Sequence, residues 1–330
     1  MLNTLLILLI SDPMASEKVL VTGATGFIGS ELVVKLLDGG CEVHTLERNV
    51  AERYDLALSN RAVPHTADLT DYQTIQAMVD EIQPEYVIHT AAVSAVSYSY
   101  DHYIEISDVD YVATINLAEA CHRSVKNFKQ FIFSGSSEEY GTTLENVNQR
   151  LTEDSELNPN SPYAVAKVAS DHYLRYMYRA YKFPYTIIRG YNTYGRRNNR
   201  HFFIEKTISQ MLSGADVRLG DPTPVRDWLY VDDHVDGFMA SFGNKKSIGQ
   251  TIQLCTGNGY TTRATAELIA KLTGFKGEIK WNSLPKRPIE TQITIGDNAK
   301  AQELLGWKPK YTLEEGLKKT IENYKNAETQ

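Results

Sequence analysis

The segment from Val19 to Ser30, V-L-V-T-G-A-T-G-F-I-G-S, constrains the fold of this chain more than any other segment. Its aliphatic start, Val19–Val21, predicts a short buried strand, because β-branched and aliphatic residues favour strands. Apolar residues at helical spacing then run from Phe27 to Leu37. The segment therefore predicts a strand, a tight turn and a helix in direct succession.

Three glycines occupy this turn, at positions 23, 26 and 29. The first suits the tight turn, the second lets the backbone approach a pyrophosphate, and the third allows close packing of the helix. The helix start also points N–H groups and the positive end of its dipole at the phosphates. A simple tight turn is the alternative, but the place between a strand and a helix is the context that the motif requires. We therefore expect a bound dinucleotide here, contacted by Gly23, Thr25, Gly26, Phe27, Ile28 and Gly29.

Composition and charge argue against several kinds of partner. The 330 residues carry 34 basic and 41 acidic side chains, a net charge of −7, without a basic block. We therefore expect neither nucleic acid nor an anionic membrane as a partner. The eight histidines show no metal-ligand spacing, so we expect no metal site. The three cysteines, Cys41, Cys121 and Cys255, form no C-x-x-C pair, which is typical of reduced thiols in a cytoplasmic protein.

Residues 1–16 are expected to form an N-terminal extension. The apolar run Leu2–Ile10 is too short to cross a bilayer. It could be the core of a signal peptide, but it lacks a basic flank and an obvious small-residue cleavage site. Because Met14 stands just before the first strand, we favour an alternative start there, preceded by a disordered or weakly docked leader.

Strands and helices alternate along most of the chain. Alternation in units of about 25–40 residues predicts an α/β fold, a Rossmann-type doubly wound parallel sheet that binds ligands at the carboxyl ends of its strands. We expect strands at 19–21, 42–46, 62–66, 86–89, 130–133, 183–189 and 251–255, and helices at 27–37, 103–124, 162–181, 202–212, 231–242 and 313–324.

The alternation loosens after residue 190, which suggests a second, smaller region. We expect an NAD(P)-binding Rossmann domain at 17–190, to which residues 227–257 return. Residues 191–226 and 258–330 are then expected to form a smaller C-terminal substrate-binding lobe.

The predicted strand ends carry residues that suit a dinucleotide. Glu47 can accept hydrogen bonds from both ribose hydroxyls of NAD and would repel the 2′-phosphate of NADP, whereas Arg48 could bind that phosphate. Two solvated surface charges are the alternative, and Glu47 favours NAD. Residues that could reach the adenine edge or leave room for the cofactor follow two later strands: Asp68, Leu69, Ala91 and Ala92.

Tyr163 and Lys167 form a candidate catalytic pair. Ser161 is a good N-cap and Pro162 suits the first helical position, so a helix is expected to begin here. Residues four apart share one helix face, and an ammonium beside a phenol lowers the phenol's pKa from about 10. Tyr163 is thus a plausible proton shuttle for a hydroxyl, and Lys167 could also hold the nicotinamide ribose. Such pairs are common in exposed helices, but this one follows a dinucleotide turn and a serine-rich strand end.

With these motifs assembled, the chain resembles the extended short-chain dehydrogenase/reductase family, and within it the nucleotide-sugar epimerases and dehydratases. The resemblance extends from Lys18 to about residue 325. It rests on Thr22-Gly-x-x-Gly-x-x-Gly29, Asp68, His89-Thr-Ala-Ala92, Ser136–Gly141, Tyr163-x-x-x-Lys167, Arg189-x-x-Asn192, Arg226-Asp227 and Arg287-Pro288.

The resemblance implies an NAD(P)-dependent enzyme that acts on a nucleotide-diphosphate sugar and forms at least a homodimer. In that family Tyr163 would be the catalytic base, Ser136 its hydroxyl partner at the sugar's O4, and Lys167 the activator of the tyrosine. Two arginines suit a doubly charged diphosphate, with unrelated surface arginines as the alternative. The implied substrate-binding residues are Ser94, Asn192, Arg226 and Arg287.

Two segments look more like GDP-mannose 4,6-dehydratase than like the galactose epimerases. Asp108–Thr114 has acids where the epimerases usually have asparagine. Arg196-Arg197, followed by Phe202 and Lys206, keeps the spacing of the dehydratases' double-arginine segment. Gly195-Arg196 and the NAD-type Glu47 depart from that pattern.

Ser136, Ser137 and Glu138 resemble the residues found here in known 4,6-dehydratases. If the chain stays extended, Ser136 and Glu138 project to one side, while Ser137 and Glu139 point away. We therefore expect a 4,6-dehydratase in which Glu138 removes the C5 proton. Because Ser137 is a poor acid by itself, we expect protonation of the C6 hydroxyl to rely on Glu138 or water. A 4-epimerase or 4-keto reductase is the closest alternative, and a catalytically silent NAD(P)-binding regulator is a further one. Glu138 and Glu139 could also be solvated loop acids.

Overall fold

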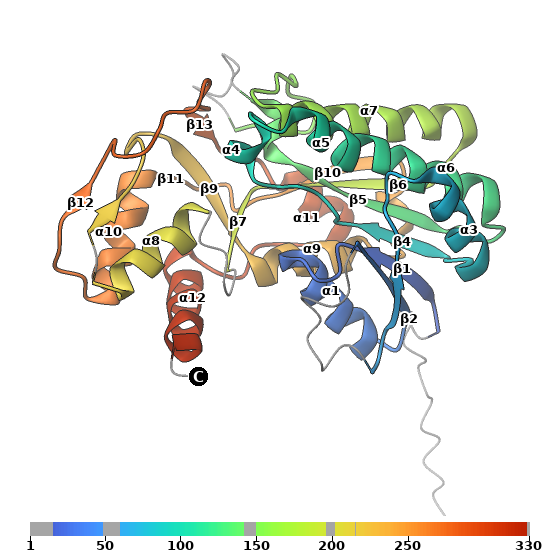
Figure 1. Cartoon of the computed structure of the whole chain (residues 1–330), viewed down its shortest axis with the longest axis horizontal. Helices are drawn as coiled ribbons and strands as arrows, with labels where there is room; N and C mark the ends of the chain where they lie inside the picture. The colour runs from blue at the N-terminus through green and yellow to red at the C-terminus, as the bar shows by residue number, and fades with distance from the viewer. Residues whose placement is uncertain (1–15, 49–59, 142–149, 196–201, 215, 329–330) are drawn as a thin grey trace, which may run out of the picture.

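The computed structural model describes residues 16–48, 60–141, 150–195, 202–214 and 216–328 (Figure 1). Seven parallel strands form its main sheet, in the order β10-β6-β5-β4-β1-β2-β3. Their bounds are Lys18–Thr22 (β1), Glu42–Glu47 (β2), Val63–Thr66 (β3), Tyr86–His89 (β4), Gln130–Ser136 (β5), Tyr185–Gly190 (β6) and Gln250–Leu254 (β10). The expected doubly wound sheet is therefore present, and each predicted strand lies in it.

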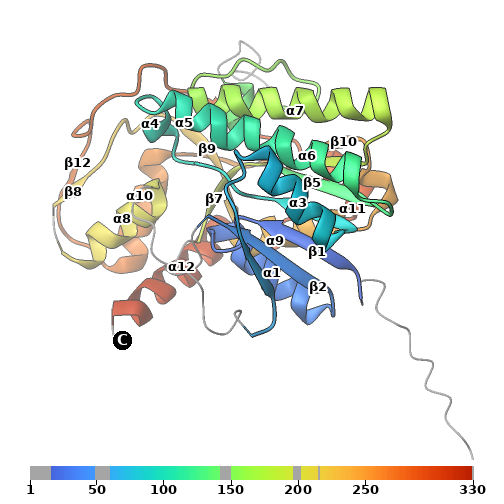
Figure 2. The ribbon, with the colours of Figure 1, turned by 45° about the vertical axis from the view of Figure 1, so that its right-hand side comes forward.

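Helices cover both faces of this sheet (Figures 1 and 2). In β1, Val19 and Val21 belong to the hydrophobic core on one face, and Leu20 belongs to the core on the other. This alternation follows from the pleat of a strand, and it leaves a parallel sheet apolar on both sides. One face packs against α3 (Tyr72–Ile82), α6 (Ala113–Ser124) and α7 (Pro162–Tyr181), the other against α1 (Phe27–Asp38) and α9 (Val231–Ser241).

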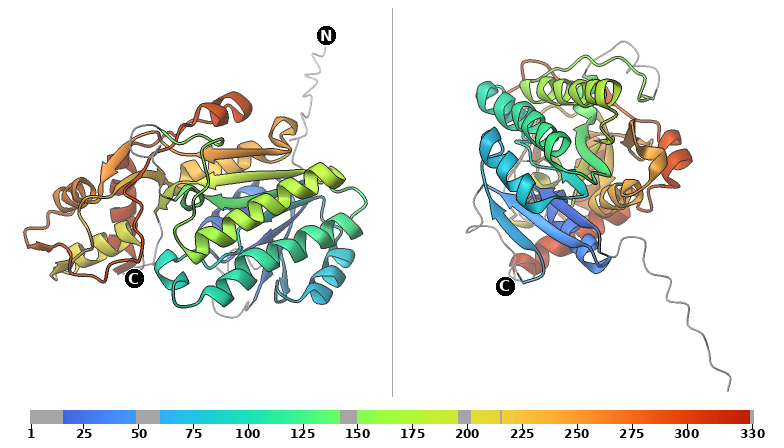
Figure 3. Two further views of the ribbon diagram at one scale, coloured as in Figure 1. Left: turned by 90° about the horizontal axis from the view of Figure 1, so that it is seen from above. Right: turned by 90° about the vertical axis from the view of Figure 1, so that its right-hand side faces the viewer.

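A smaller group of elements lies to one side of the main sheet (Figures 1 and 3). Its strands are Asn192–Tyr194 (β7), Val225–Tyr230 (β9), Gly259–Thr261 (β11) and Ile293–Thr294 (β13) in one sheet, with Val217–Arg218 (β8) and Ile279–Lys280 (β12) as a separate pair. Its helices are Phe203–Leu212 (α8), Thr262–Thr273 (α10) and Leu313–Glu328 (α12). The boundary expected at residue 227 falls within β9, and the division into domains stays a prediction.

The helix expected at 103–124 is divided by a wider turn. It consists of α5 (Tyr103–Ser107), a π turn at Asp108–Val112, and α6. Apolar spacing does not distinguish a single π turn from the α-helix around it, so this change could not be predicted from the sequence. The described residues also form four short elements: α4 (Val96–Ser99), a 3₁₀ turn at Ser137–Tyr140, a 3₁₀ turn at Lys245–Ser247, and α11 (Ala299–Leu305).

The described residues include no helix that is both long and apolar enough to span a membrane. Within the same part of the chain, no group of three or more histidine, cysteine or acidic side chains could hold a metal ion. Cys41, Cys121 and Cys255 are buried free thiols. The predicted N-terminal extension lies outside the described residues, except for Ser16.

Candidate active site at the carboxyl ends of the strands

The glycine-rich turn joins β1 to α1 beside the end of β4. Gly23 has a φ of +70°, a backbone conformation that favours glycine. A Cβ atom there would lie 2.7 Å from the backbone N of Ala91, and one at Gly29 would lie 2.1 Å from the carbonyl O of Gly23. Helix α1 begins after Gly26 without a side-chain cap. The turn thus has the tight geometry and the helix start that suit a pyrophosphate.

Glu47 ends β2 beside this turn. Its carboxylate accepts hydrogen bonds from Thr25, at 2.7 Å from the backbone N–H and at 2.8 Å from the hydroxyl. Arg48 and Asp68 are exposed. A dinucleotide requires an acceptor for its ribose at the end of the second strand and a turn whose backbone can approach the phosphates. Glu47 and the glycines at 23, 26 and 29 supply these, so the residues present fit this cofactor. The other residues predicted for it are half-buried: Phe27, Ile28, Leu69, Ala91 and Ala92.

Ser136 and Tyr163 come together from different elements. Ser136 ends β5, Tyr163 lies in the first turn of α7, and their side chains form a hydrogen bond. Both side chains are buried, at 8% and 7% exposed. Burial raises the pKa of Tyr163, and the Asp110 carboxylate raises it further, while the hydrogen bond with Ser136 opposes both effects. The pKa of Tyr163 is therefore raised and not lowered as expected, and Lys167 is not among the main causes of its shift.

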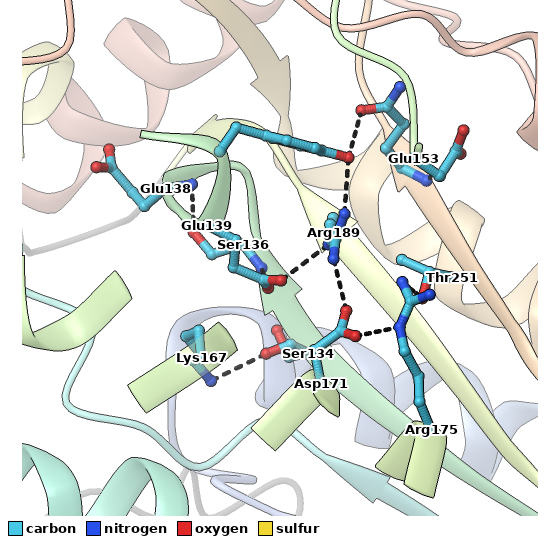
Figure 4. Close-up of polar contacts among 12 residues, drawn as sticks. Ser134, Ser136, Glu138, Glu139, Glu153, Lys167, Asp171, Arg175, Arg189 and Thr251 are labelled. Atoms are coloured by element: carbon cyan, nitrogen blue, oxygen red, sulfur yellow. Dashed lines mark hydrogen bonds and ion pairs between the residues drawn. The ribbon is translucent and has the colours of Figure 1, made fainter. Parts of the chain in front are cut away.

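Lys167 lies one helical turn after Tyr163, but its ammonium points to the sheet. Its Nζ donates a hydrogen bond to the carbonyl O of Ser134 at 2.9 Å (Figure 4) and lies 5.8 Å from the centre of the Tyr163 ring. The side chain is 1% exposed, and burial lowers its pKa. The predicted pair thus shares a helix face, with Lys167 also held by the strand that carries Ser136.

The chain does not remain extended after Ser136, which corrects the predicted geometry of the next three residues. Ser136 instead caps the 3₁₀ turn, because its Oγ accepts the N–H of Glu138 at 3.1 Å and its own N–H is accepted by Glu139 Oε1 at 2.7 Å. Ser137 is buried, Glu138 is half-buried, and Glu139 is fully buried. Glu139 is therefore no solvated loop acid. Its side chain points toward Arg189, and the side chain of Glu138 points in the opposite direction (Figure 4).

Arg189, near the end of β6, links this turn to α7 (Figure 4). Its Nε donates to Glu139 Oε2 at 2.9 Å, and its Nη2 donates to Asp171 Oδ2 at 2.7 Å. Its Nη1 donates to the hydroxyl of Tyr140 at 3.0 Å. Because Asp171 lies one turn after Lys167 in α7, a single buried guanidinium holds the Ser136 turn against the helix that carries Tyr163.

Arg226 and Arg287 converge on one carboxylate. Arg226, in β9, is 7% exposed, and its Nη2 lies 2.5 Å from Glu290 Oε1. Nη1 of Arg287 lies 3.7 Å from the same oxygen. Burial lowers the pKa of Arg226, and Glu138 is the first of the acids that oppose this effect. Glu138 also raises the pKa of Tyr163, and its backbone N–H donates to Ser136 Oγ at 3.1 Å.

The remaining residues predicted to bind the substrate differ in burial, and two of them lie outside the described residues. Asn192 begins β7, and its Nδ2 is buried without a hydrogen-bond partner among the described residues. Ser94 is exposed on the loop between β4 and α4. Arg196-Arg197 lies outside the described residues, and Phe202 directly precedes α8.

Two contributions to the site were not predicted from the sequence. Glu139 was grouped with its neighbour as an acid at a loop, and Glu290 was not considered at all. A signal for Glu139 does exist in the sequence: Arg189 ends a strand of apolar residues, and a charge in such a strand requires a buried partner. No comparable pattern marks Glu290.

The doubly wound sheet, the glycine turn and the Ser136–Tyr163–Lys167 arrangement define a protein of the extended short-chain dehydrogenase/reductase class. The family model described as GDP-mannose 4,6 dehydratase matches residues 20–320. The chain therefore belongs to this family of nucleotide-sugar epimerases and dehydratases.

Known relatives include both kinds of enzyme. The chain is 32% identical over 323 residues to a UDP-glucose 4-epimerase of Mycolicibacterium smegmatis, covering 94% of this chain and 99% of the relative. It is 28% identical to a dTDP-glucose 4,6-dehydratase of Salmonella typhimurium, covering 93% and 92%. Among solved structures, the Thermus thermophilus UDP-glucose 4-epimerase in complex with NAD matches with a TM-score of 0.85 at 28% identity, covering 94% of this chain and 99% of that one. The relatives thus support an enzyme but differ in the reaction.

Proposed function

We propose that the protein is a nucleotide-sugar 4,6-dehydratase that uses NAD and converts a nucleotide-diphosphate hexose to its 4-keto-6-deoxy form. The observation that carries the proposal is the place of Glu138, a half-buried acid in the 3₁₀ turn that Ser136 caps, with its backbone N–H 3.1 Å from Ser136 Oγ. An epimerase needs no further acid or base after C4 is oxidised. A dehydratase does, because it must also remove the C5 proton.

Different residues of the site bind the diphosphate and the sugar of the substrate. Arg226 and Arg287 bind the diphosphate, because guanidinium groups pair well with its oxygens. Asn192 donates its unpaired Nδ2–H to the sugar nucleotide. Since the two arginines already meet at the Glu290 carboxylate, they are spaced to share one anion.

Tyr163 and Ser136 act at the O4 hydroxyl of the sugar. Ser136 orients the hydroxyl and Tyr163 takes its proton, as general acid–base groups at hydrogen-bond distance do. NAD, when bound to the glycine turn, Glu47 and Lys167, supplies a hydride acceptor for C4 and later a hydride donor for C6. The ketone at C4 acidifies the C5 proton, which Glu138 then removes as the C6 hydroxyl leaves as water. Glu138 or a water molecule supplies the proton for this leaving group, and C5 regains a proton from Glu138 or solvent when C6 accepts the hydride.

The second candidate is a UDP-sugar 4-epimerase. It is favoured by the higher identity to the Mycolicibacterium smegmatis enzyme, 32% against 28% for the dehydratase. If the protein is an epimerase, Glu138 has no role in the reaction. A 4-keto reductase would need the same residues at O4.

One experiment separates these reactions. The purified protein is incubated with a panel of nucleotide sugars that differ in base and hexose, and the products are analysed by mass spectrometry and NMR. We expect a product lighter than its substrate by one water, with a methyl group at C5. A product of unchanged mass and inverted C4 would show the epimerase instead, and no product from any sugar would favour a silent dinucleotide-binding protein.

A further inference from the structure

The segment 287–291, which we call the arginine strap, lies between β12 and β13 and carries Arg287. It leads into β13, which pairs with β9. Glu290 of the strap contacts the arginine of β9, as described above. Its two neighbours, Ile289 and Thr291, instead contact residues of the region that contains the main sheet. Three successive residues of the strap thus join it to both parts of the molecule.

Thr291 joins the strap to the residues that precede α7. Its Oγ1 accepts a hydrogen bond from Nδ2 of Asn160 at 3.1 Å, and Thr291 is buried. Asn160 is followed by Ser161, whose hydroxyl caps α7 by accepting the N–H of Ala164 at 3.1 Å. Tyr163 lies in the first turn of this helix. The hydrogen bond of Thr291 therefore holds the strap close to the start of the helix that carries Tyr163.

Tyr100 contacts the same place from the end of α4. Its hydroxyl lies 2.9 Å from the carbonyl O of Asn160 and 3.4 Å from the carbonyl O of Ile289. The single phenol proton is thus shared between the chain before α7 and the strap, with the shorter contact to Asn160. Burial raises the pKa of Tyr100, so the phenol keeps this proton near pH 7. Tyr100, Asn160 and Thr291 form one hydrogen-bonded junction, which we call the latch.

The latch joins the two places at which a nucleotide sugar would be held. The number of bonds between the diphosphate and the O4 hydroxyl of such a substrate is fixed, so the arginines and Tyr163 must lie at a matching distance. Arg287 is on the strap and Tyr163 is on α7, and these segments belong to different parts of the fold. A displacement of about 1 Å from the reacting geometry can lower a rate by about 100-fold.

We propose that Tyr100, Asn160 and Thr291 are positioning residues whose latch holds the arginine strap against the start of α7 and so sets the distance from the diphosphate to Tyr163. The proposal rests on the proposed function, because it assigns the latch to a nucleotide-diphosphate sugar that Arg287 binds. Each neutral hydrogen bond contributes modestly to stability, so the loss of one should loosen the strap without unfolding the protein.

The test compares substitutions that differ by a hydroxyl group. Thr291→Val and Tyr100→Phe each remove one hydroxyl of the latch. Thr291→Ser keeps the hydroxyl, and Tyr98→Phe removes that of a tyrosine in α4 that donates to Glu105 instead. Full-length protein is digested with an endoproteinase that cleaves after lysine. Mass spectrometry then follows the cut after Lys286, an exposed residue directly before the strap.

Cleavage of a held segment follows the population of its open form when closing is faster than cleavage. We therefore expect the initial rate of this cut to rise about 3–10-fold in Thr291→Val and in Tyr100→Phe, the effect of losing one net hydrogen bond. The rate should stay unchanged in Thr291→Ser and Tyr98→Phe. An unchanged rate in both latch variants would overturn the proposal. If Thr291→Val does not fold, Thr291→Ala is digested in its place, with the same expected rise.

Binding and turnover test whether the latch positions the substrate. Calorimetric titration with UDP, dTDP and GDP should show affinity for at least one of them, weakened about 3–10-fold in the two latch variants because the strap must then be ordered on binding. The affinity for NAD should not change, since the glycine turn is untouched, whereas a general loss of structure would weaken NAD binding as well. With the nucleotide sugar, kcat should fall by about 10-fold or more, and Thr291→Ser should restore it.

The outcomes for the two proposals are distinct. A protein that converts no nucleotide sugar and binds none of the three nucleoside diphosphates would contradict the proposed function, while the cut after Lys286 would still show whether the latch holds the strap. If the natural protein turns over a nucleotide sugar and both latch variants keep its kcat and its nucleoside diphosphate affinity, the positioning role of the latch is refuted and the proposed function stands.

Discussion

Glu139 and Arg189 form an ion pair in which both side chains are fully buried, with Oε2 and Nε 2.9 Å apart. The same guanidinium also pairs with Asp171, which is equally buried, at 2.7 Å. Burial alone raises the pKa of Glu139, and Arg189 opposes this because it favours the carboxylate. The network thus joins the strand end that carries Ser136 to the helix that carries Tyr163, so we infer that it fixes the distance between the two.

Removing the guanidinium should destabilise the protein strongly. Arg189→Met leaves Glu139 and Asp171 buried without their cation, and breaking a buried pair typically costs about 3–5 kcal/mol. Arg123→Met is the matched control, since Arg123 pairs with Glu119 at 2.9 Å on the surface, where such pairs contribute about 1 kcal/mol or less. Urea unfolding at pH 7 measures the free energy of unfolding of both variants. A similar decrease in the two variants would contradict a strong contribution from the buried pairs.

The sequence predicted the fold better than the detail of the site. Strands such as 86–89 have a strong apolar pattern between clear breaks, and the structure places β4 at the same residues. The turn after Ser136 was predicted wrongly, because an extended chain was assumed where Ser136 itself caps a 3₁₀ turn. Glu139 shows why: whether an acid next to a turn is solvated or buried depends on Arg189, which lies 50 residues away. Local patterns do not contain such partners.

The cofactor released from the purified protein is expected to be NAD. Glu47 lies at the end of β2 and accepts two hydrogen bonds from Thr25, so it is placed to meet a ribose and to repel a 2′-phosphate. Denaturing the protein and identifying the dinucleotide by mass spectrometry tests this. Glu47→Gln should retain less NAD than Glu42→Gln, a change at the exposed start of the same strand. Release of NADP would show that Arg48 governs the site.

Tyr163→Phe should lower kcat by about 10²–10⁴-fold, the usual contribution of a general acid–base group. The KM for the nucleotide sugar should barely change, because Arg226 and Arg287 are left intact. Tyr176→Phe, an exposed tyrosine of the same helix, serves as the control and should keep its activity. Steady-state assays of both variants measure kcat and KM. A Tyr163→Phe enzyme that keeps most of its activity would refute the role of Tyr163 as the acid–base group.

The protein is expected to form at least a dimer through α5 and α7. Tyr103 and Ile104 of α5 are 59% and 64% exposed, and Val165 of α7 is 53% exposed, which is unusual for apolar side chains on adjacent helices. Two-fold dimers are the commonest oligomers, and a self-complementary helix pair suits one. Light scattering at micromolar concentration should give a dimer mass that Ile104→Glu reduces. Ile289→Glu, at 52% exposed outside these helices, should leave it unchanged.

Glu138 should separate dehydration from the oxidation that precedes it. Its side chain is half-buried beside the Ser136–Tyr163 pair, and its backbone N–H is already used by Ser136, so Glu138→Gln leaves that cap in place. The variant should still oxidise C4, because Tyr163 and Lys167 remain. Without the carboxylate, the C5 proton has no base.

We therefore expect Glu138→Gln to accumulate NADH and the 4-keto sugar, to stop exchanging the C5 hydrogen with deuterated water, and to form no dehydrated product. Absorbance of the reduced nicotinamide and NMR of the sugar measure these outcomes. Glu156→Gln, at an exposed position well after the 3₁₀ turn, is a charge-matched control that should dehydrate normally. If the natural protein yields only a C4 epimer, or if Glu138→Gln dehydrates its substrate at the natural rate, Glu138 is not the C5 base.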